Sequence, residues 1–248
     1  MSEEKQEKAT KAPKLADPVQ ASIDVATQEM IQRAHDLGVE TVFDRAENMK
    51  PCNIGVQGTC CKNCAMGPCR LPLPKSGIEG KDERRGMCGA TANTIAARNF
   101  IRMIAGGAAA HSDHGRCVAE VFLSAARKET EAYKIKDTTK LLEIAPYFDV
   151  ATTVEVDGEV KDRDIDEIAL EVAEKALNEW GKAEGEVLYM KRAPQALYEK
   201  WKKNGVIPRN IDREIVEIMH RTHIGVDQDF RNLIKQGTRC ALADGWGG

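Results

Sequence analysis

Hydrophobic residues recur at helical spacing near the start of the chain. In segment 21–35 the apolar positions fall on one helical face, at Ile23, Ala26, Met30, Ile31 and Ala34. Gly38 is suited to end this helix, and a short helix is expected over 44–49. Residues 1–20 mix Lys, Glu, Ala and Pro without periodicity, which predicts a mobile tail.

After residue 90 the pattern is helical again. The spacing predicts helices over 91–104, 111–128, 139–146, 164–180, 194–203, 212–220 and 227–243. Gly106 and Gly107 predict a break or a close-packing point between the first two of these helices. One short run, 186–191, is strand-like.

Segment 51–89 interrupts the helical pattern and is rich in Cys, Gly and Pro. It predicts irregular backbone, and a long irregular segment inside a compact domain usually has a function such as holding a metal. The expected fold class is therefore all-α: a helical domain over 21–248, folded around a cysteine-rich cluster-binding loop at 51–89.

Composition narrows the possible classes of protein. The chain has 248 residues and a net charge of −3, which argues against a nucleic-acid binder. No apolar run approaches the ~20 residues of a membrane helix, and the first residues lack the apolar core of a secretory signal. We therefore expect a cytoplasmic protein without a membrane span, in which dense cysteines bind metal or do redox chemistry.

The cysteine spacing is compatible with three kinds of chemistry. Cys61, Cys64, Cys69 and Cys88 form C-x2-C-x4-C-x18-C. Four thiolates can hold a [4Fe-4S] cluster, one per iron. Structural zinc also takes four thiolates, although usually from two C-x-x-C pairs. Disulfides or unliganded buried thiols are the third possibility. Spacing alone leaves all three open.

Cys52 and Cys60 remain outside that set. Cys60 directly precedes Cys61, and adjacent side chains tend to point in different directions, so Cys60 could serve a second centre. Two thiolates do not complete a four-ligand site, but a two-fold dimer would complete it. The alternative is a disulfide or two unliganded thiols. Cys117 and Cys240 are most simply small buried hydrophobes.

Several stretches together resemble nickel-containing anaerobic carbon monoxide dehydrogenase, in its N-terminal part. They are CNIGVQGTCCKNCAMGPCR, RRGMCGATANTIAARN, AGGAAAHSDHGR, EIMHRTHIG and RCALADGWGG. The resemblance runs from near Val25 to the end of the chain. It implies a homodimer, with Cys61, Cys64, Cys69 and Cys88 on an intrachain [4Fe-4S] cluster. Cys52 and Cys60 would be ligands of a subunit-bridging cluster, [4Fe-4S] or [2Fe-2S].

The sequence departs from that family in two ways. The nickel–iron–sulfur active site of the family takes its ligands from residues beyond ALADGWGG, so we expect this chain to be an N-terminal domain that does not oxidise CO by itself. Members also often carry a helical row of histidines that moves protons. His111 and His114 match its first two positions, but Cys117 and Glu120 occupy the next two. The alternative for His111 is a helix-start group.

The resemblance implies an iron–sulfur electron-transfer and dimerisation domain of a carbon monoxide dehydrogenase. The full enzyme would convert CO and water to CO2, two electrons and two protons, with a ferredoxin-like acceptor. One alternative is the carbon monoxide dehydrogenase subunit of an acetyl-CoA synthase complex. The other is a zinc-stabilised helical interaction module.

Overall fold

The structure, a computed structural model, describes residues 13–247. The chain divides into two compact units, of which the first ends at Val56 and the second begins at Gln57. Helices dominate both units, in agreement with the expected class, although two short antiparallel sheets occur as well. The division falls inside the cysteine-rich segment. No helix of the described residues combines the length and the apolar character that crossing a membrane requires.

The first unit holds four short helices: α1 (Pro18–Ala21), α2 (Val25–Asp36), α3 (Val42–Asn48) and α4 (Asn53–Val56). The helices expected over 21–35 and 44–49 correspond to α2 and α3. Gly38 has the positive φ of 68° that favours glycine after a helix. Residues 1–12 of the expected tail lie outside the described residues. The rest of it packs on α3 instead, because the Lys14 amide donates to Asn48 at 3.0 Å.

Asp44 of α3 is the polar centre of this unit. Its carboxylate accepts hydrogen bonds from the Thr41 hydroxyl at 2.6 Å and from the Ala16 amide at 2.8 Å, and it lies 2.8 Å from His35 Nε2. Thr41 and Asp44 also form a capping box at the start of α3. The Thr41 hydroxyl, the Ala16 amide and His35 hold the pKa of Asp44 well below its ordinary 3.8, although burial opposes this shift.

We expect Asp44→Asn to loosen the first unit at neutral pH. A carboxylate whose pKa is lowered by folding stabilises the fold above its unfolded pKa of 3.8, and the contribution is lost as the pH falls through the lowered folded pKa. Amide hydrogen exchange of peptides from 13–48 should be faster in the variant at neutral pH, and the difference should narrow below pH 3.8. A difference independent of pH would contradict this role for Asp44.

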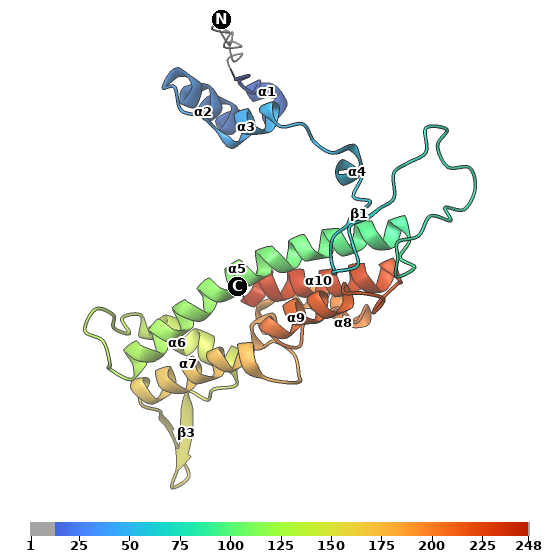
Figure 1. Ribbon diagram of the computed structural model, residues 1–248. Helices are drawn as coiled ribbons and strands as arrows, with labels where there is room; N and C mark the ends of the chain where they lie inside the picture. The colour runs from blue at the N-terminus through green and yellow to red at the C-terminus, as the bar shows by residue number, and fades with distance from the viewer. Residues whose placement is uncertain (1–12, 248) are drawn as a thin grey trace, which may run out of the picture. The chain divides into compact units, whose positions relative to one another are not determined.

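The second unit is built around one long helix, α5 (Ala92–Ala126), which Figure 1 shows beside the other helices. These are α6 (Thr138–Ile144), α7 (Ile165–Gly181), α8 (Gln195–Lys203), α9 (Ile211–Arg221) and α10 (Phe230–Gly247), with the 3-10 helices η1 (Ala145–Phe148) and η2 (Leu188–Arg192). Helices α9 and α10 pack on the first half of α5, in a core that includes Ile101, Ile218 and Leu233. Near its end, α5 contributes Ala126 to a second core with Ile168 of α7.

The break expected at Gly106 and Gly107 is wrong, because α5 continues through both. A glycine inside a helix costs about 1 kcal/mol relative to alanine. The flanking Ala105 and Ala108 are buried in the core shared with α9 and α10, and this packing offsets the cost. The two glycines are not close-packing points either. Among the described residues outside the helix backbone, no heavy atom lies within 4 Å of a Cβ built on either one.

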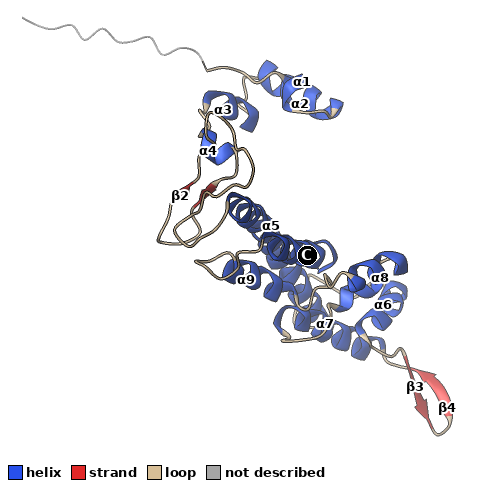
Figure 2. Ribbon diagram, turned by 90° about the vertical axis from the view of Figure 1, so that its right-hand side faces the viewer, coloured by secondary structure: helices blue, strands red, loops and turns tan. Residues whose placement is uncertain are grey.

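A β-hairpin, absent from the sequence predictions, leads into α7. β3 (Thr153–Val156) pairs with β4 (Glu159–Asp162), and Figure 2 shows the pair extending away from the helices of its unit. Asp157 and Gly158 form the turn and both have positive φ, as a two-residue hairpin turn of the favoured type requires. The strand expected over 186–191 is wrong, since most of that run belongs to η2.

Gly237 of α10 marks a close approach between α10 and α5. A Cβ built there would lie 2.6 Å from Ile101 Cγ2. We expect Gly237→Ala to destabilise the second unit by roughly 1–3 kcal/mol, because the added methyl overpacks a closed core. Urea denaturation followed by tryptophan fluorescence measures this, since all three tryptophans of the chain lie in this unit.

Gly245→Ala in the same helix is the matched control. Apart from the adjacent residues and the backbone of its own helix, no described heavy atom lies within 4 Å of a Cβ built at Gly245. This change should stabilise the unit by about 0.5–1 kcal/mol, because alanine loses less conformational freedom than glycine on forming a helix. Equal effects at the two positions would show that contact with Ile101 is not what excludes a side chain at Gly237.

Candidate functional site

A two-residue ladder organises the cysteine-rich segment. It is formed by β1 (Cys60–Cys61) and β2 (Cys69–Arg70). Cys61 stands opposite Cys69, and the turn between the strands carries Cys64, whose carbonyl accepts from the Gly67 amide at 3.2 Å. A Cβ at Gly67 would lie 2.9 Å from the Cys61 carbonyl oxygen, so only glycine fits there. One tight hairpin thus brings three cysteines together.

The fourth cysteine, Cys88, lies just before α5. The Thr91 hydroxyl caps this helix by accepting from the Thr94 amide at 3.0 Å. The Met87 amide donates to Cys69 Sγ at 3.4 Å. The turn that precedes α5 is therefore hydrogen-bonded to the cysteine hairpin, and Cys88 lies at their junction.

Cys61, Cys64, Cys69 and Cys88 line one cavity of the second unit. The structure records no disulfide among these four residues. Apolar side chains form part of the wall, from Met66, Ala90, Ile95 and Ile224. Within residues 13–247, no three His, Cys, Asp or Glu side chains converge closely enough to hold a single metal ion.

Two side chains on the cavity wall carry donors without an acceptor. Asn63 Nδ2 and Arg98 Nε are buried and have no hydrogen-bond partner among the described residues. Buried donors in proteins are normally satisfied, by protein groups, water or a ligand. The two unpaired donors therefore indicate that this cavity holds an acceptor.

Cys88 is hydrogen-bonded by one side chain of α5 and by one from the loop that precedes α10. Arg98 Nη1 lies 3.5 Å and Gln228 Nε2 3.8 Å from its Sγ. Burial raises the pKa of the Cys88 thiol, but hydrogen bonds from Arg98, from the Gly225 and Ala90 amides and from Gln228 outweigh it and lower the pKa to about 7. Near neutral pH the thiolate, which is the form that binds metal, is therefore more populated at Cys88 than at an ordinary cysteine.

These features fit a [4Fe-4S] cluster. Its four irons each take one thiolate, so the ligands stand around the cluster, and its sulfurs accept hydrogen bonds from nearby donors. A structural zinc ion requires four thiolates at about 2.3 Å from one centre. The two unpaired donors on the cavity wall suit the first arrangement better, because the sulfurs of a cluster accept hydrogen bonds.

Cys60 lies beside this cavity but does not line it. It precedes Cys61 on β1, and its carbonyl accepts from Asn99 Nδ2 at 3.0 Å. Side chains alternate along a strand, which separates Cys60 from Cys61. Cys52 belongs to the first unit of the chain. The second centre expected from Cys52 and Cys60 stays a prediction.

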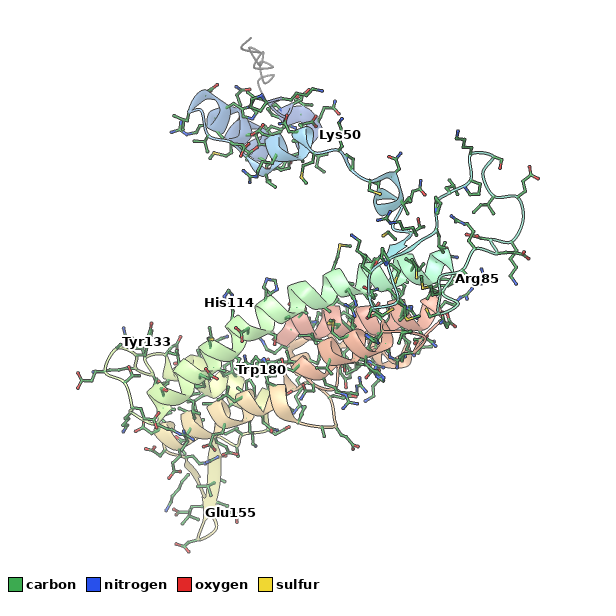
Figure 3. All side chains as sticks on the ribbon, viewed as in Figure 1. Lys50, Arg85, His114, Tyr133, Glu155 and Trp180 are labelled. Carbon is green, nitrogen blue, oxygen red and sulfur yellow. The ribbon has the colours of Figure 1, made fainter. Side chains whose placement is uncertain are left out.

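The expected histidine row lies on α5, outside the cysteine cavity. His111 Nδ1 is 2.9 Å from Asp244 Oδ1, and Figure 3 shows His114 pointing outward from α5. His111 is not a helix-start group, because α5 begins at Ala92 and is continuous. Glu120, further along the helix, is exposed. Proton transfer along this row stays a prediction.

The two remaining cysteines differ from each other. Cys240 is buried as expected, and burial raises the pKa of its thiol to about 12. Cys117 is exposed, contrary to expectation. The core face of α5 here runs through Ser112 and Ala119, which are buried, and Cys117 falls outside that face.

Arg98, Asn63 and Gln228 were not predicted from the sequence. The available signal for Arg98 was an arginine on the same helical face as Ile101 and Ala105, which are core residues. Asn63 lies inside the C-x-x-C turn. Gln228 is 140 residues from Cys88, and nothing local in its sequence points to the cysteines.

Comparison with known proteins gives consistent results. Residues 59–248 match the Prismane/CO dehydrogenase family. Carbon monoxide dehydrogenase 1 of Methanosarcina acetivorans is 47% identical over 92% of this chain and 34% of its own length. The carbon monoxide dehydrogenase/acetyl-CoA synthase subunit beta of Moorella thermoacetica is 36% identical, over 95% of this chain and 34% of its own length. This chain thus spans about a third of these relatives.

Solved structures agree with the sequence matches. A Ni-free crystal structure of carbon monoxide dehydrogenase from Thermococcus sp. AM4 superposes with a TM-score of 0.76 and 42% identity, covering 94% of this chain and 35% of that one. An acetyl-CoA synthase/carbon monoxide dehydrogenase structure, described by NiZn[Fe4S4] and NiNi[Fe4S4] clusters in its alpha subunits, gives a TM-score of 0.75 and 36% identity. It covers 96% of this chain and 34% of its own.

Proposed function

Because this chain belongs to the Prismane/CO dehydrogenase family, we propose that its second unit holds an intrachain [4Fe-4S] cluster and serves electron relay in a carbon monoxide dehydrogenase. The observation that carries the proposal is one cavity lined by Cys61, Cys64, Cys69 and Cys88. The two unpaired donors on its wall support an occupant that accepts hydrogen bonds.

The residues of the cavity have separate tasks in this proposal. When bound, the cluster would take up and release one electron. The four cysteines hold it, and the lowered pKa of Cys88, about 7, favours the thiolate needed for binding. Asn63 and Arg98 direct donors toward the cluster's sulfurs. Ala90 and Ile95, which are almost completely buried, exclude water from one wall.

The resemblance of the sequence extends the proposal to a dimer. Cys52 and Cys60 of two chains would hold a [4Fe-4S] or [2Fe-2S] cluster on a two-fold axis, and the protein would be a homodimer. Within a carbon monoxide dehydrogenase that converts CO and water to CO2 at a nickel–iron–sulfur site, these residues would deliver electrons to a ferredoxin-like acceptor. His111 and His114 would assist proton transfer.

A second possibility concerns the assembly in which the chain works. The Moorella thermoacetica relative is named as a subunit of carbon monoxide dehydrogenase/acetyl-CoA synthase, and one similar structure is of such a complex. The chain could therefore belong to an acetyl-CoA synthase complex with the same cysteine centre.

Iron and acid-labile sulfide, counted per chain after purification without oxygen, test the proposal. We expect about six irons, or about five if the bridging cluster is [2Fe-2S], because a shared cluster contributes half its irons to each chain. About four would support the intrachain cluster and argue against the bridging one. One zinc and no iron would overturn electron relay and favour the zinc-stabilised module.

A further inference from the structure

We propose that Arg98 provides the counter-charge of the cysteine centre and raises its reduction potential. This inference rests on the proposed function, because it requires a cluster in the cavity. Arg98 lies on α5, is 1% exposed, and lines the cavity next to Cys88. It is a positioning residue, since it contacts a cysteine sulfur and not a substrate.

The charge of Arg98 has no carboxylate partner within residues 13–247. Its Nη2 donates to the Asp227 carbonyl at 2.6 Å, its Nη1 to Cys88 Sγ at 3.5 Å, and its Nε has no partner. The Asp227 carboxylate itself is engaged by Arg221 at 2.9 Å. A buried cation requires a compensating charge. Among the described groups, the Cys88 sulfur is the contact of Arg98 that can supply one.

The loop between α9 and α10, residues 222–229, keeps this arrangement in place. The Thr94 hydroxyl donates to the Gln228 carbonyl at 2.7 Å, and Gln228 Nε2 donates to the Cys88 carbonyl at 2.8 Å. The loop is thereby tied to α5 on one side and to the cysteine turn on the other. Arg98, held between them by the Asp227 carbonyl, stays next to the sulfur.

The sign of the effect follows from charge. Reduction of a cluster adds one negative charge, and a fixed cation nearby stabilises the reduced form more than the oxidised form. This interaction is stronger in a protein interior than in water because the effective dielectric constant is lower. Charge and hydrogen bonds near the sulfurs are among the factors that set cluster potentials. Arg98 should therefore make the centre easier to reduce.

The test compares Arg98→Met with Arg98→Lys in the whole chain, loaded with its clusters without oxygen. The midpoint potential is measured by redox titration followed by electron paramagnetic resonance. At a given solution potential, Arg98→Met should raise the ratio of oxidised to reduced cluster at least tenfold. This corresponds to a fall of about 59 mV in the midpoint potential of a one-electron couple. Arg98→Lys keeps the charge and should retain most of the potential.

Arg102→Met is the matched control. Arg102 lies one turn further along α5 and donates to Thr222 Oγ1 at 2.8 Å, so it also ties α5 to the 222–229 loop, but it does not line the cavity. Its replacement should leave the potential unchanged. Gln228→Glu is a second test that spares the core, since Gln228 is exposed. A carboxylate placed there should lower the potential in the same direction as Arg98→Met.

The possible outcomes separate this inference from the proposed function. Equal potentials in the wild type, Arg98→Met and Gln228→Glu, with equal iron contents, would overturn the role of Arg98 and leave the cluster assignment standing. A wild-type chain without iron would overturn both. If Arg98→Met fails to bind a cluster, Gln228→Glu decides, and an unchanged potential in that variant would overturn the inference.

Discussion

Replacing Cys64 with alanine should remove about four irons per chain, together with a matching amount of acid-labile sulfide. Cys64 lines the cavity with Cys61, Cys69 and Cys88, and the turn that carries it is closed by the Gly67 amide. With three thiolates, one iron of the cluster has no protein ligand, and the cluster is no longer retained through purification. The measurement is metal analysis after purification without oxygen, with the visible absorbance of the cluster as a second readout.

Two further variants make this result specific. Cys117→Ala is the matched control, because Cys117 is exposed on α5 and outside the cavity, and its iron content should equal that of the wild type. Cys60→Ala should lower the iron content by only about one or two per chain, which is the share of a bridging cluster. Equal iron contents in Cys64→Ala and Cys117→Ala would show that the cavity is not the iron site.

That Cys61, Cys64, Cys69 and Cys88 meet at one cavity was predictable because most of them are close in sequence. Cys61, Cys64 and Cys69 lie within one hairpin, so their spacing records the geometry of the site directly. Cys88 is further along the chain but lies shortly before the start of a helix, and both features can be read locally. A residue type that binds metal, repeated at short intervals, leaves a signal that needs no knowledge of the tertiary fold.

The surroundings of the centre were not predictable in the same way. Gln228 reaches Cys88 across 140 residues, and Arg98 meets the Asp227 carbonyl across 129. Such contacts depend on how α5, α9 and α10 pack, and no local pattern encodes them. Arg98 was the exception in principle, since an arginine among core positions of an amphipathic helix is unusual.

The differences between the predicted and the observed fold have physical causes. Gly106 and Gly107 suggested a break from local propensity, but packing of Ala105 and Ala108 in the core carries α5 through them. The β3–β4 hairpin does carry a strong turn signal in its sequence, Asp157-Gly158 between alternating residues. In the first case tertiary packing overrode a local preference, and in the second a local preference alone would have been sufficient.

Glu214 links the two helices that carry the 222–229 loop. It lies on α9 and is 0% exposed. Its carboxylate accepts from Arg209 Nε at 3.0 Å and from Gln236 Nε2 of α10 at 2.8 Å. Hydrogen bonding by Glu214 raises the pKa of Arg209 above its ordinary value, although burial opposes the shift. One buried carboxylate therefore satisfies a cation and an amide from two different segments.

Glu214→Ala should destabilise the second unit by about 3–5 kcal/mol, because removing one partner leaves the others buried and uncompensated. Arg209 is partly exposed and keeps Glu217, which favours the lower end of this range. Gln236 is almost completely buried, so solvent cannot replace the acceptor that its side-chain amide would lose. Glu214→Gln keeps an acceptor oxygen and should cost less, about 1–3 kcal/mol. Urea denaturation followed by tryptophan fluorescence measures both variants.

Glu199→Ala on α8 supplies the control, because Glu199 is exposed and its replacement should change the free energy of unfolding by less than about 0.5 kcal/mol. If Glu214→Ala were no more destabilising than this control, the α9–α10 pair would be held by its apolar contacts alone. In that case the loop that ties Arg98 to Cys88 would not depend on the buried carboxylate. If the loss is as large as expected, the polar link between α9 and α10 is part of what keeps the wall of the cysteine cavity in place.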